Sequence, residues 1–127
     1  MPLYHVWFAT KRRKWLLQGD VDDLVKEIMI SVATERGIDL IECETVVDHA
    51  HLLIRASDRR ELSRAINYIK GLTSKRLFEQ LPERKLDIGM NNFWQHRYEC
   101  KVIPERAKEP VAHYIRTQKD RLEKYAR

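Results

Sequence analysis

Apolar residues along the chain follow first a strand pattern and then a helical one. Residues 3–10 (LYHVWFAT) are rich in aromatic and β-branched side chains, which favours a strand. Gly19-Asp20 then introduces a helix with apolar residues at helical spacing, and Gly37 is placed to end it. The apolar positions of this helix are Val21, Leu24, Val25, Ile28 and Val32.

The middle of the chain predicts a tight hairpin followed by a second helix. Residues 38–47 (IDLIECETVV) and 49–56 (HAHLLIRA) are strand candidates, separated by the turn residue Asp48. Asp58, with Glu61 three residues on, resembles a capping box that opens a helix. An apolar face then continues up to Pro82, formed by Leu62, Ala65, Ile66, Ile69, Leu72 and Leu77.

The last third of the chain predicts a loop, a strand and a helix. Residues 83–92 are polar and irregular, which is typical of a mobile loop, and residues 93–103 (FWQHRYECKVI) predict a fourth strand. A final helix is predicted from about residue 106 to residue 126. Because Pro110 is tolerated only in a first helical turn, the helix start is expected nearer Glu109.

The predicted order is therefore βαββαβ followed by a C-terminal helix, which is an α+β fold. It matches the ferredoxin-like, RRM-like arrangement, in which two helices cover one face of an antiparallel sheet. The other face must then be covered by the last helix, by a partner chain or by a ligand. The length of 127 residues fits one domain, residues 1–127.

Composition excludes several classes of protein. Hydrophobic residues make up 43% of the chain, enough for one core, which argues against disorder. No apolar run approaches the roughly 18 residues of a membrane span, and the N-terminus lacks the apolar region of a signal peptide. Cys43 and Cys100 have no CxxC spacing, so we expect them to be buried small hydrophobic residues. These features predict a cytoplasmic protein without a membrane partner.

The charge balance favours an anionic partner. Lys and Arg total 24 against 19 Asp and Glu, which gives a net charge of +5. Nucleic acid is the first candidate for such a partner. Basic residues gather at Lys11–Lys14 and again at Arg55, Arg59 and Arg60, although each cluster by itself fits a solvated turn equally well.

Two histidines stand on one face of the third predicted strand. Alternation places His49 and His51 together, whereas Ala50, Leu52 and Ile54 point to the opposite face. If those three pack under the helices, the histidines lie on the uncovered face. Two imidazoles at this spacing can share one divalent cation. By itself, however, an HxH pattern favours two hydrogen-bonded strand histidines without metal.

The last helix carries a second pair of candidate residues. Tyr114 and Gln118 lie four residues apart, so they project from one side of that helix. A tyrosine beside an amide oxygen offers a nucleophile and a metal ligand, whereas the simpler interpretation is a packed Tyr and a solvated Gln. Val111, Ile115 and Leu122 already supply an apolar stripe toward the core, which leaves Tyr114 less needed there.

Four segments in a fixed order connect these patterns to a known family. They are YHVWFATKRRK (4–14), DHAHLLI (48–54), FWQHRYECKVI (93–103) and YIRTQ (114–118). Together they span essentially the whole chain, and HxH followed by YxxxQ on a terminal helix is far more specific than either piece. The chain resembles the HUH-type single-tyrosine transposases, the insertion-sequence-200-like family, whose relatives include the REP-associated tyrosine transposases.

The resemblance implies a site and a reaction. His49, His51 and Gln118 are expected to bind Mg²⁺ or Mn²⁺, and Tyr114 to attack a phosphodiester of single-stranded DNA, including transposon-end hairpins. A phenol is mostly protonated at neutral pH, so a cation that polarises the phosphate would help both attack and departure of the 3′-hydroxyl. The product would be a 5′-phosphotyrosine bond for later strand transfer. Ala50 is smaller than the family's usual residue, which should thin the packing and leave the chemistry intact.

Further residues suit a single-stranded substrate. His5 and Trp7 share a strand face, where aromatic rings can stack on bases. For Trp7, Trp15 and Trp94, however, a place in the core or in a subunit interface is the favoured interpretation. Cationic side chains expected to meet phosphates are Lys11, Arg12, Arg55 and Arg97. Such a protein would associate with the nucleoid of a prokaryotic cell when bound to DNA.

Two other functions compete with the transposase. A non-catalytic single-stranded nucleic-acid-binding module, such as a domesticated transposase, suits the fold but needs no HxH with YxxxQ. It would also be expected to carry the RRM aromatic signature, which is absent. A metal-dependent hydrolase would use His49 and His51 to activate water and would not need Tyr114.

A homodimer with composite active sites is also predicted. The polar connector of residues 105–109 can direct the last helix onto a neighbouring subunit. Edge strands, including residues 93–103, offer unpaired backbone groups to a two-fold partner. In such dimers of the family, the tyrosine of one chain can serve the histidine pair of the other.

Overall fold

The predicted order of elements is confirmed by a computed structural model that describes residues 1–83 and 92–119. The strands are β1 (Leu3–Ala9), β2 (Asp39–Val46), β3 (His49–Arg55) and β4 (Glu99–Ile103). The helices are α1 (Gly19–Glu35), α2 (Arg59–Gln80) and α4 (Lys108–Arg116), with short 3-10 helices η1 (Lys11–Arg13) and η2 (Glu105–Ala107). None of the helices in the described ranges is both long and apolar enough to cross a membrane.

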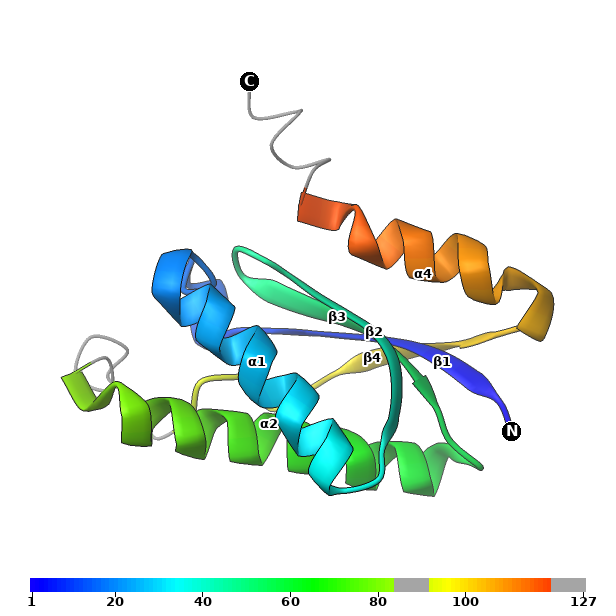
Figure 1. Cartoon of the computed structure of the whole chain (residues 1–127), viewed down its shortest axis with the longest axis horizontal. Coiled ribbons are helices and arrows are strands. Elements are labelled where there is room, and N and C mark those ends of the chain that lie inside the picture. Colours follow the sequence, from blue (N-terminus) through cyan, green and yellow to red (C-terminus); the bar gives the residue numbers. More distant parts are fainter. Residues whose placement is uncertain (84–91, 120–127) are drawn as a thin grey trace.

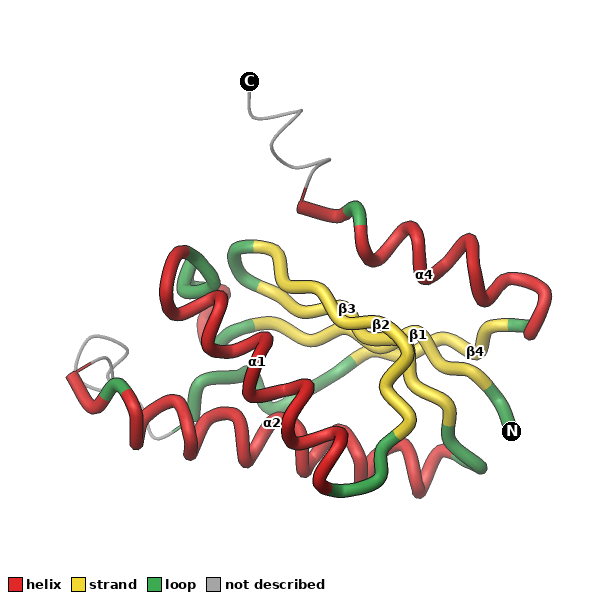
Figure 2. Tube along the Cα trace, viewed as in Figure 1, coloured by secondary structure: helices red, strands yellow, loops and turns green. Residues whose placement is uncertain are grey.

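The strands form one antiparallel sheet in the order β2-β3-β1-β4, as in a ferredoxin-like fold. Helices α1 and α2 cover one face, and α4 lies over the other (Figures 1 and 2). In the register, Val6 lies opposite Leu52 and Trp7 lies opposite His51. Because paired residues on neighbouring strands share a face, the apolar and the chemically active positions separate onto the two sides of the sheet.

Each face of the sheet has its own apolar cluster. The larger cluster lies under α1 and α2 and includes Val6, Ala50, Leu52 and Ile54 of the sheet. A smaller cluster lies under α4 and contains Leu3, Leu53, Ile103, Ala112 and Ile115. Burial of each large aliphatic side chain contributes about 1.5–3 kcal/mol, so the smaller cluster can hold α4 on the sheet. The last helix therefore covers the second face.

Local signals in the sequence explain the helix ends. The Asp58 carboxylate accepts a hydrogen bond from the Glu61 N–H at 2.9 Å and thereby caps α2. Gly37 adopts a φ of +66° just beyond α1, a conformation that glycine accepts without steric cost. Pro110 lies in the first turn of α4. Cys43 and Cys100 are free, half-buried thiols that pack against the larger apolar cluster, as expected of small hydrophobic residues.

The fourth strand is shorter than predicted. It begins at Glu99, not at residue 93. Phe93 and Trp94 are fully buried in the core, and Trp94 keeps only an isolated bridge to Thr10. The carbonyls of residues 95–97 accept hydrogen bonds from the Lys70 ammonium, so they do not join the sheet. Most of the predicted loop 83–92 and the end of the predicted helix 106–126 lie outside the described residues.

Candidate active site

A pocket of about 540 Å³ lies where β3, β1 and α4 meet, and it brings both predicted pairs together. His49 and His51 line it from β3, and Tyr114 and Gln118 line it from α4 and the residues just after it. A larger hollow, of about 690 Å³, lies along α2 but contains neither pair. The chemistry of the lining residues, not the size of the cavity, therefore identifies the site.

The two histidines lie on the sheet face that α4 covers, as alternation predicted. Their ring centroids are 4.8 Å apart, with the rings edge-on to each other. Ala50 between them is fully buried on the opposite face. His51 is buried, whereas His49 is half-buried at the end of the strand. The pair can thus present two ring nitrogens to one pocket.

Asp48 fixes which nitrogen of His49 faces the pocket. Asp48 Oδ1 lies 2.7 Å from His49 Nδ1, and an ionised carboxylate can only accept a hydrogen bond. In the neutral ring His49 Nδ1 therefore carries the proton, and Nε2 has the lone pair that a metal requires. Burial raises the pKa of the Asp48 carboxyl, but hydrogen bonds and positive charge from His49 and Arg13 lower that pKa overall. Asp48 is consequently ionised at neutral pH.

The hairpin turn before His49 contains a strained residue, and two other segments of the chain form hydrogen bonds to it. Val47 has a φ of +52°, a left-handed conformation that costs a β-branched residue on the order of 1–3 kcal/mol. The Thr10 N–H donates to the Asp48 carbonyl at 2.8 Å, and the Leu17 N–H donates to the Val47 carbonyl at 2.9 Å. These two bonds fix the position of Asp48 and hence of the His49 ring.

His5 adds a third imidazole to the site. Its Nε2 lies 3.1 Å from His51 Nδ1, across the β1–β3 pairing. Burial, and then the charges of His49 and His5, lower the pKa of His51 to about 4. Burial, and then Lys101, lower the pKa of His5. Both rings are therefore neutral at neutral pH, and when His51 Nδ1 donates to His5, His51 Nε2 is available as a metal ligand. The sequence placed His5 on this face but gave it no such role.

Tyr114 and Gln118 line the same pocket as the histidines, on the side of α4. The Tyr114 ring lies edge-on to His5 and His51, with centroids 6.1 and 6.4 Å away. Its neighbour Ile115 is fully buried and fixes the rotation of α4. The Gln118 side-chain N–H donates to the Tyr114 carbonyl at 3.1 Å, so the Gln118 amide oxygen remains as the acceptor.

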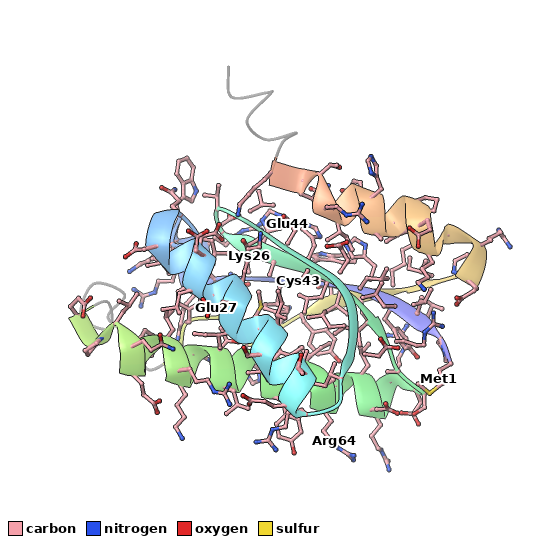
Figure 3. The ribbon with its side chains drawn as sticks, in the orientation of Figure 1. Met1, Lys26, Glu27, Cys43, Glu44 and Arg64 are labelled. Atoms are coloured by element: carbon pink, nitrogen blue, oxygen red, sulfur yellow. The ribbon has the colours of Figure 1, made fainter. Side chains whose placement is uncertain are left out.

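Lys119 anchors the end of this helical segment to the sheet edge. Its ammonium pairs with the buried carboxylate of Asp22 on α1 and lies 3.4 Å from a Glu44 carboxylate oxygen. Glu44 also pairs with Lys26 at 2.9 Å, and Figure 3 labels both residues, which come from β2 and from the middle of α1. This network holds Gln118, the residue before Lys119, beside the histidines. No local pattern in the sequence indicated this network.

The donor set fits a divalent cation. His49, His51 and Gln118 line a single pocket, and one nitrogen of each imidazole has a partner within the fold, which leaves its other nitrogen as a candidate ligand. Within residues 1–83 and 92–119, no group of three or more His, Cys, Asp or Glu side chains could hold a metal. With three donors from the chain, a cation held here would keep further coordination positions for water or phosphate.

Of the four residues predicted to contact DNA, one lines the pocket and three do not. Arg97 lines the pocket, together with Arg13, which was predicted only as part of the basic cluster Lys11–Lys14. Lys11 and Arg12 belong to η1 but do not line the pocket. Arg55 lies at the far end of β3 from His49, where it donates to the Glu105 carboxylate at 2.9 and 3.0 Å. Its charge is therefore largely used within the fold.

The three tryptophans lie in three different environments. Trp94 is fully buried, as expected for a core residue. Trp7 is half-buried, lines the pocket and lies 5.0 Å from the His5 ring by centroids. Trp15 is 75% exposed, so it is not a core residue. Trp7 is thus the tryptophan that borders the candidate site.

Known proteins share both the sequence and the fold. The chain is 29% identical to the ISDra2 transposase TnpA of Deinococcus radiodurans over 93% of the chain and 84% of that protein. It is 26% identical to the transposase for insertion sequence element IS200 of Salmonella typhimurium, over 91% of the chain and 75% of that protein.

Two solved structures resemble the chain. A candidate transposase from Deinococcus radiodurans superposes with a TM-score of 0.72 at 28% identity, over 93% of this chain and 92% of that one. A REP-associated tyrosine transposase bound to a REP hairpin gives 0.61 at 18% identity, over 91% and 65%, and shows the fold alone. The family model described as "Transposase IS200 like" matches residues 2–118, and the chain therefore belongs to the IS200-like transposases, a family of DNA-processing enzymes.

Proposed function

We propose that this protein cleaves single-stranded DNA through Tyr114 and rejoins it through a 5′-phosphotyrosine intermediate. The observation that carries the proposal is the shared pocket. Tyr114 and Gln118, near one end of the chain, meet His49 and His51 from its middle. A fold that needed these residues only for packing would not gather a phenol, an amide and two imidazoles around an open pocket.

His49, His51 and Gln118 would hold Mg²⁺ or Mn²⁺. When bound, the cation would neutralise charge on the scissile phosphate and polarise it toward attack. The protein's own contribution is orientation: Asp48 and His5 hold the outer nitrogens of the two histidines, and the Lys119 network holds Gln118. Because the ligands are positioned in advance, little side-chain freedom is lost when the metal binds.

In the cleavage step the Tyr114 phenol oxygen attacks phosphorus. A phenol oxygen–phosphorus bond forms, and the bond between phosphorus and the 3′-oxygen breaks. The proton of the phenol is balanced by the proton that the departing 3′-oxygen takes up to become a hydroxyl. The reverse attack by a different 3′-hydroxyl joins that strand to the 5′-phosphate and frees the tyrosine. No nucleotide hydrolysis is needed, because the phosphotyrosine bond retains the energy of the cleaved bond.

A single DNA strand is the substrate that this pocket suits. Arg97 and Arg13 border it and can pair with phosphates, and the Trp7 ring can stack on a base. A structural neighbour was solved with a REP hairpin, and we infer that this chain likewise acts on hairpins at transposon ends. It would do so in the cytoplasm, associated with nucleoid DNA.

The test is covalent capture with strands labelled at one end or the other. After incubation with Mn²⁺, a denaturing gel should show label on the protein when the 3′ end carries it. Label at the 5′ end should leave with the fragment that ends in a 3′-hydroxyl. A binding module would give no adduct with either label, and a metal-dependent hydrolase would release both fragments free of protein.

The homodimer stays a prediction. In a single chain Tyr114 already lies over its own histidine pair, so a site within one subunit is geometrically available. The connector before α4, which includes η2, would have to redirect that helix to build a site shared between subunits.

A further inference from the structure

Lys70 is a buried cation that the proposed chemistry does not use. It lies on α2 and is 8% exposed. Its Nζ donates to the carbonyl oxygens of Gln95, His96 and Arg97 at 2.6, 3.2 and 3.2 Å. An ammonium has three N–H donors, so all of them are used. Three successive peptide groups are thus turned toward one charge.

This arrangement determines where the other ends of those peptide groups point. A trans peptide is planar, and its N–H points opposite to its C=O. The N–H groups of His96, Arg97 and Tyr98 therefore point away from Lys70. In the described part of the chain, none of these three N–H groups has a hydrogen-bond partner. They form a run of donors between Gln95, whose N–H donates to the Ala9 carbonyl, and β4.

The same segment forms one wall of the candidate active site. Gln95, Arg97 and Tyr98 line the pocket that also contains Tyr114, whereas His96 between them lines the hollow along α2. Arg97 is exposed and has no ion pair within residues 1–83 and 92–119. Successive backbone N–H groups make concave sites for anions, and a guanidinium beside them adds a charged fork.

We propose that residues 95–98 are a phosphate-binding wall for the DNA strand, which Lys70 holds in shape from behind. The ligand is a phosphodiester of the strand that enters the pocket, contacted by the N–H groups of residues 96–98 and by Arg97. Lys70 does not touch the DNA and is a positioning residue. This inference rests on the proposed function and adds to it the place where the strand's backbone is held.

The buried charge also favours an anion at this wall. Burial lowers the pKa of Lys70 to about 8, so the side chain remains largely protonated at neutral pH. The peptide dipoles direct their negative carbonyl ends to this ammonium and their positive N–H ends away from it. Both the dipoles and the charge attract a phosphate placed at this wall.

The first test compares four variants in binding of a single-stranded oligonucleotide without divalent metal. Lys70→Met keeps the length of the side chain but removes its charge and its hydrogen-bond donors. Arg97→Ala removes the guanidinium group. Each should weaken binding about tenfold and lower the dependence on salt by about one phosphate contact. The double variant should bind hardly worse than either single one, because Lys70 acts through the wall that carries Arg97. Lys75→Met, an exposed lysine on the same helix, is the control and should bind within about twofold of wild type.

The second test needs no variant and so does not depend on Lys70→Met folding. In the amide NMR spectrum of the wild-type protein, the N–H signals of His96, Arg97 and Tyr98 should shift on addition of the oligonucleotide. If the chemical shifts of these signals do not change while the wild type binds DNA and forms its adduct, the proposed phosphate contact at residues 95–98 is rejected and the proposed function stands. Strictly additive losses in the double variant would also overturn it. A wild-type protein that neither binds nor captures DNA would instead reject the proposed function.

Discussion

His5 Nε2 lies 3.1 Å from His51 Nδ1, so a histidine on β1 holds the inner histidine of the candidate metal site on β3. Both rings are buried enough to be neutral at neutral pH. This contact leaves His51 with one nitrogen for the protein and one for a metal, as Asp48 does for His49.

Replacement of His5 by Phe should therefore weaken metal binding without removing a ligand. Loss of such an outer partner typically costs 10–100-fold in metal affinity, and a loss of about tenfold is expected here. Titration calorimetry with Mn²⁺ on the purified protein measures it. His113→Ala, an exposed histidine of α4 outside the pocket, should leave the affinity unchanged. An unchanged affinity in His5→Phe would mean that His51 needs no help from β1.

The lowered pKa of His51 predicts an acid-sensitive metal-free protein. Its folded pKa of about 4 lies below the ordinary value of 6.5, so the unfolded chain binds more protons between these values. The free energy of unfolding should be highest above pH 6.5 and fall as the pH drops toward 4, by about 3 kcal/mol at most from this residue. Urea unfolding in EDTA at pH 7 and pH 5 gives the comparison. In His51→Gln the difference between the two pH values should shrink, and an equal difference in both proteins would assign it elsewhere.

Removal of the Tyr114 hydroxyl should separate binding from chemistry. Tyr114→Phe keeps the ring over His5 and His51, so the fold and the affinity for single-stranded DNA should change little. Covalent capture of 3′-labelled DNA should fall below detection, because no phenol oxygen is left to attack. His113→Phe, on the same helix, should capture DNA as wild type does. An adduct that persists in Tyr114→Phe would point to another tyrosine, such as Tyr125, which belongs to the predicted helix 106–126 and lies outside the described residues.

These tests address a site whose outline was readable in the sequence. Alternation placed His49 and His51 on one face and Ala50 on the other, and helical spacing placed Tyr114 beside Gln118. Such regularities are local, so a sequence displays them directly. The order βαββαβ followed from the same periods, and residues Asp58 and Gly37 marked helix ends through their own chemistry.

The parts that were missed depend on contacts between distant segments. The predicted strand 93–103 was too long because Lys70, on α2, turns the carbonyls of residues 95–97 away from the sheet. Arg55 was expected to contact DNA, a prediction that stays untested, and in the structure it pairs with Glu105. No local pattern in a sequence reveals which partner a long charged side chain will find, since the partner is chosen by the tertiary structure.

The ion pair between Lys119 and Asp22 should determine how strongly α4 and residues 117–119 are held against the sheet of the same chain. Lys119→Met leaves the buried carboxylate of Asp22 with Thr45 as its remaining described partner, which should lower the free energy of unfolding by about 1–3 kcal/mol. Capture of labelled DNA should fall, because Gln118 is no longer held beside the histidines. The double variant with Asp22→Asn should regain much of the lost stability. If Lys119→Met alone unfolds as wild type does, the pairing contributes nothing to holding the helix.

Subunit exchange decides whether the site is built within one chain or shared between two. Tyr114→Phe lacks the nucleophile, and His49→Ala lacks a metal ligand, so neither variant should capture DNA alone. If the homodimer forms and its tyrosines serve the partner's histidines, a mixture of the two variants should regain up to half of the activity per mixed dimer. That dimer then contains one site with an intact histidine pair and an intact tyrosine. If each subunit uses its own tyrosine, as the contact of Tyr114 with His5 and His51 allows, the mixture should stay inactive.

The mixture should be repeated with Lys119→Met added to the His49→Ala chain, which supplies the intact tyrosine. Release of α4 from its own sheet would free that tyrosine for the partner, so recovery should then rise or first appear. Sedimentation at micromolar concentration must accompany both mixtures, because complementation requires a dimer. A monomer in sedimentation would remove the shared site altogether, and the arrangement within one chain would be the working enzyme.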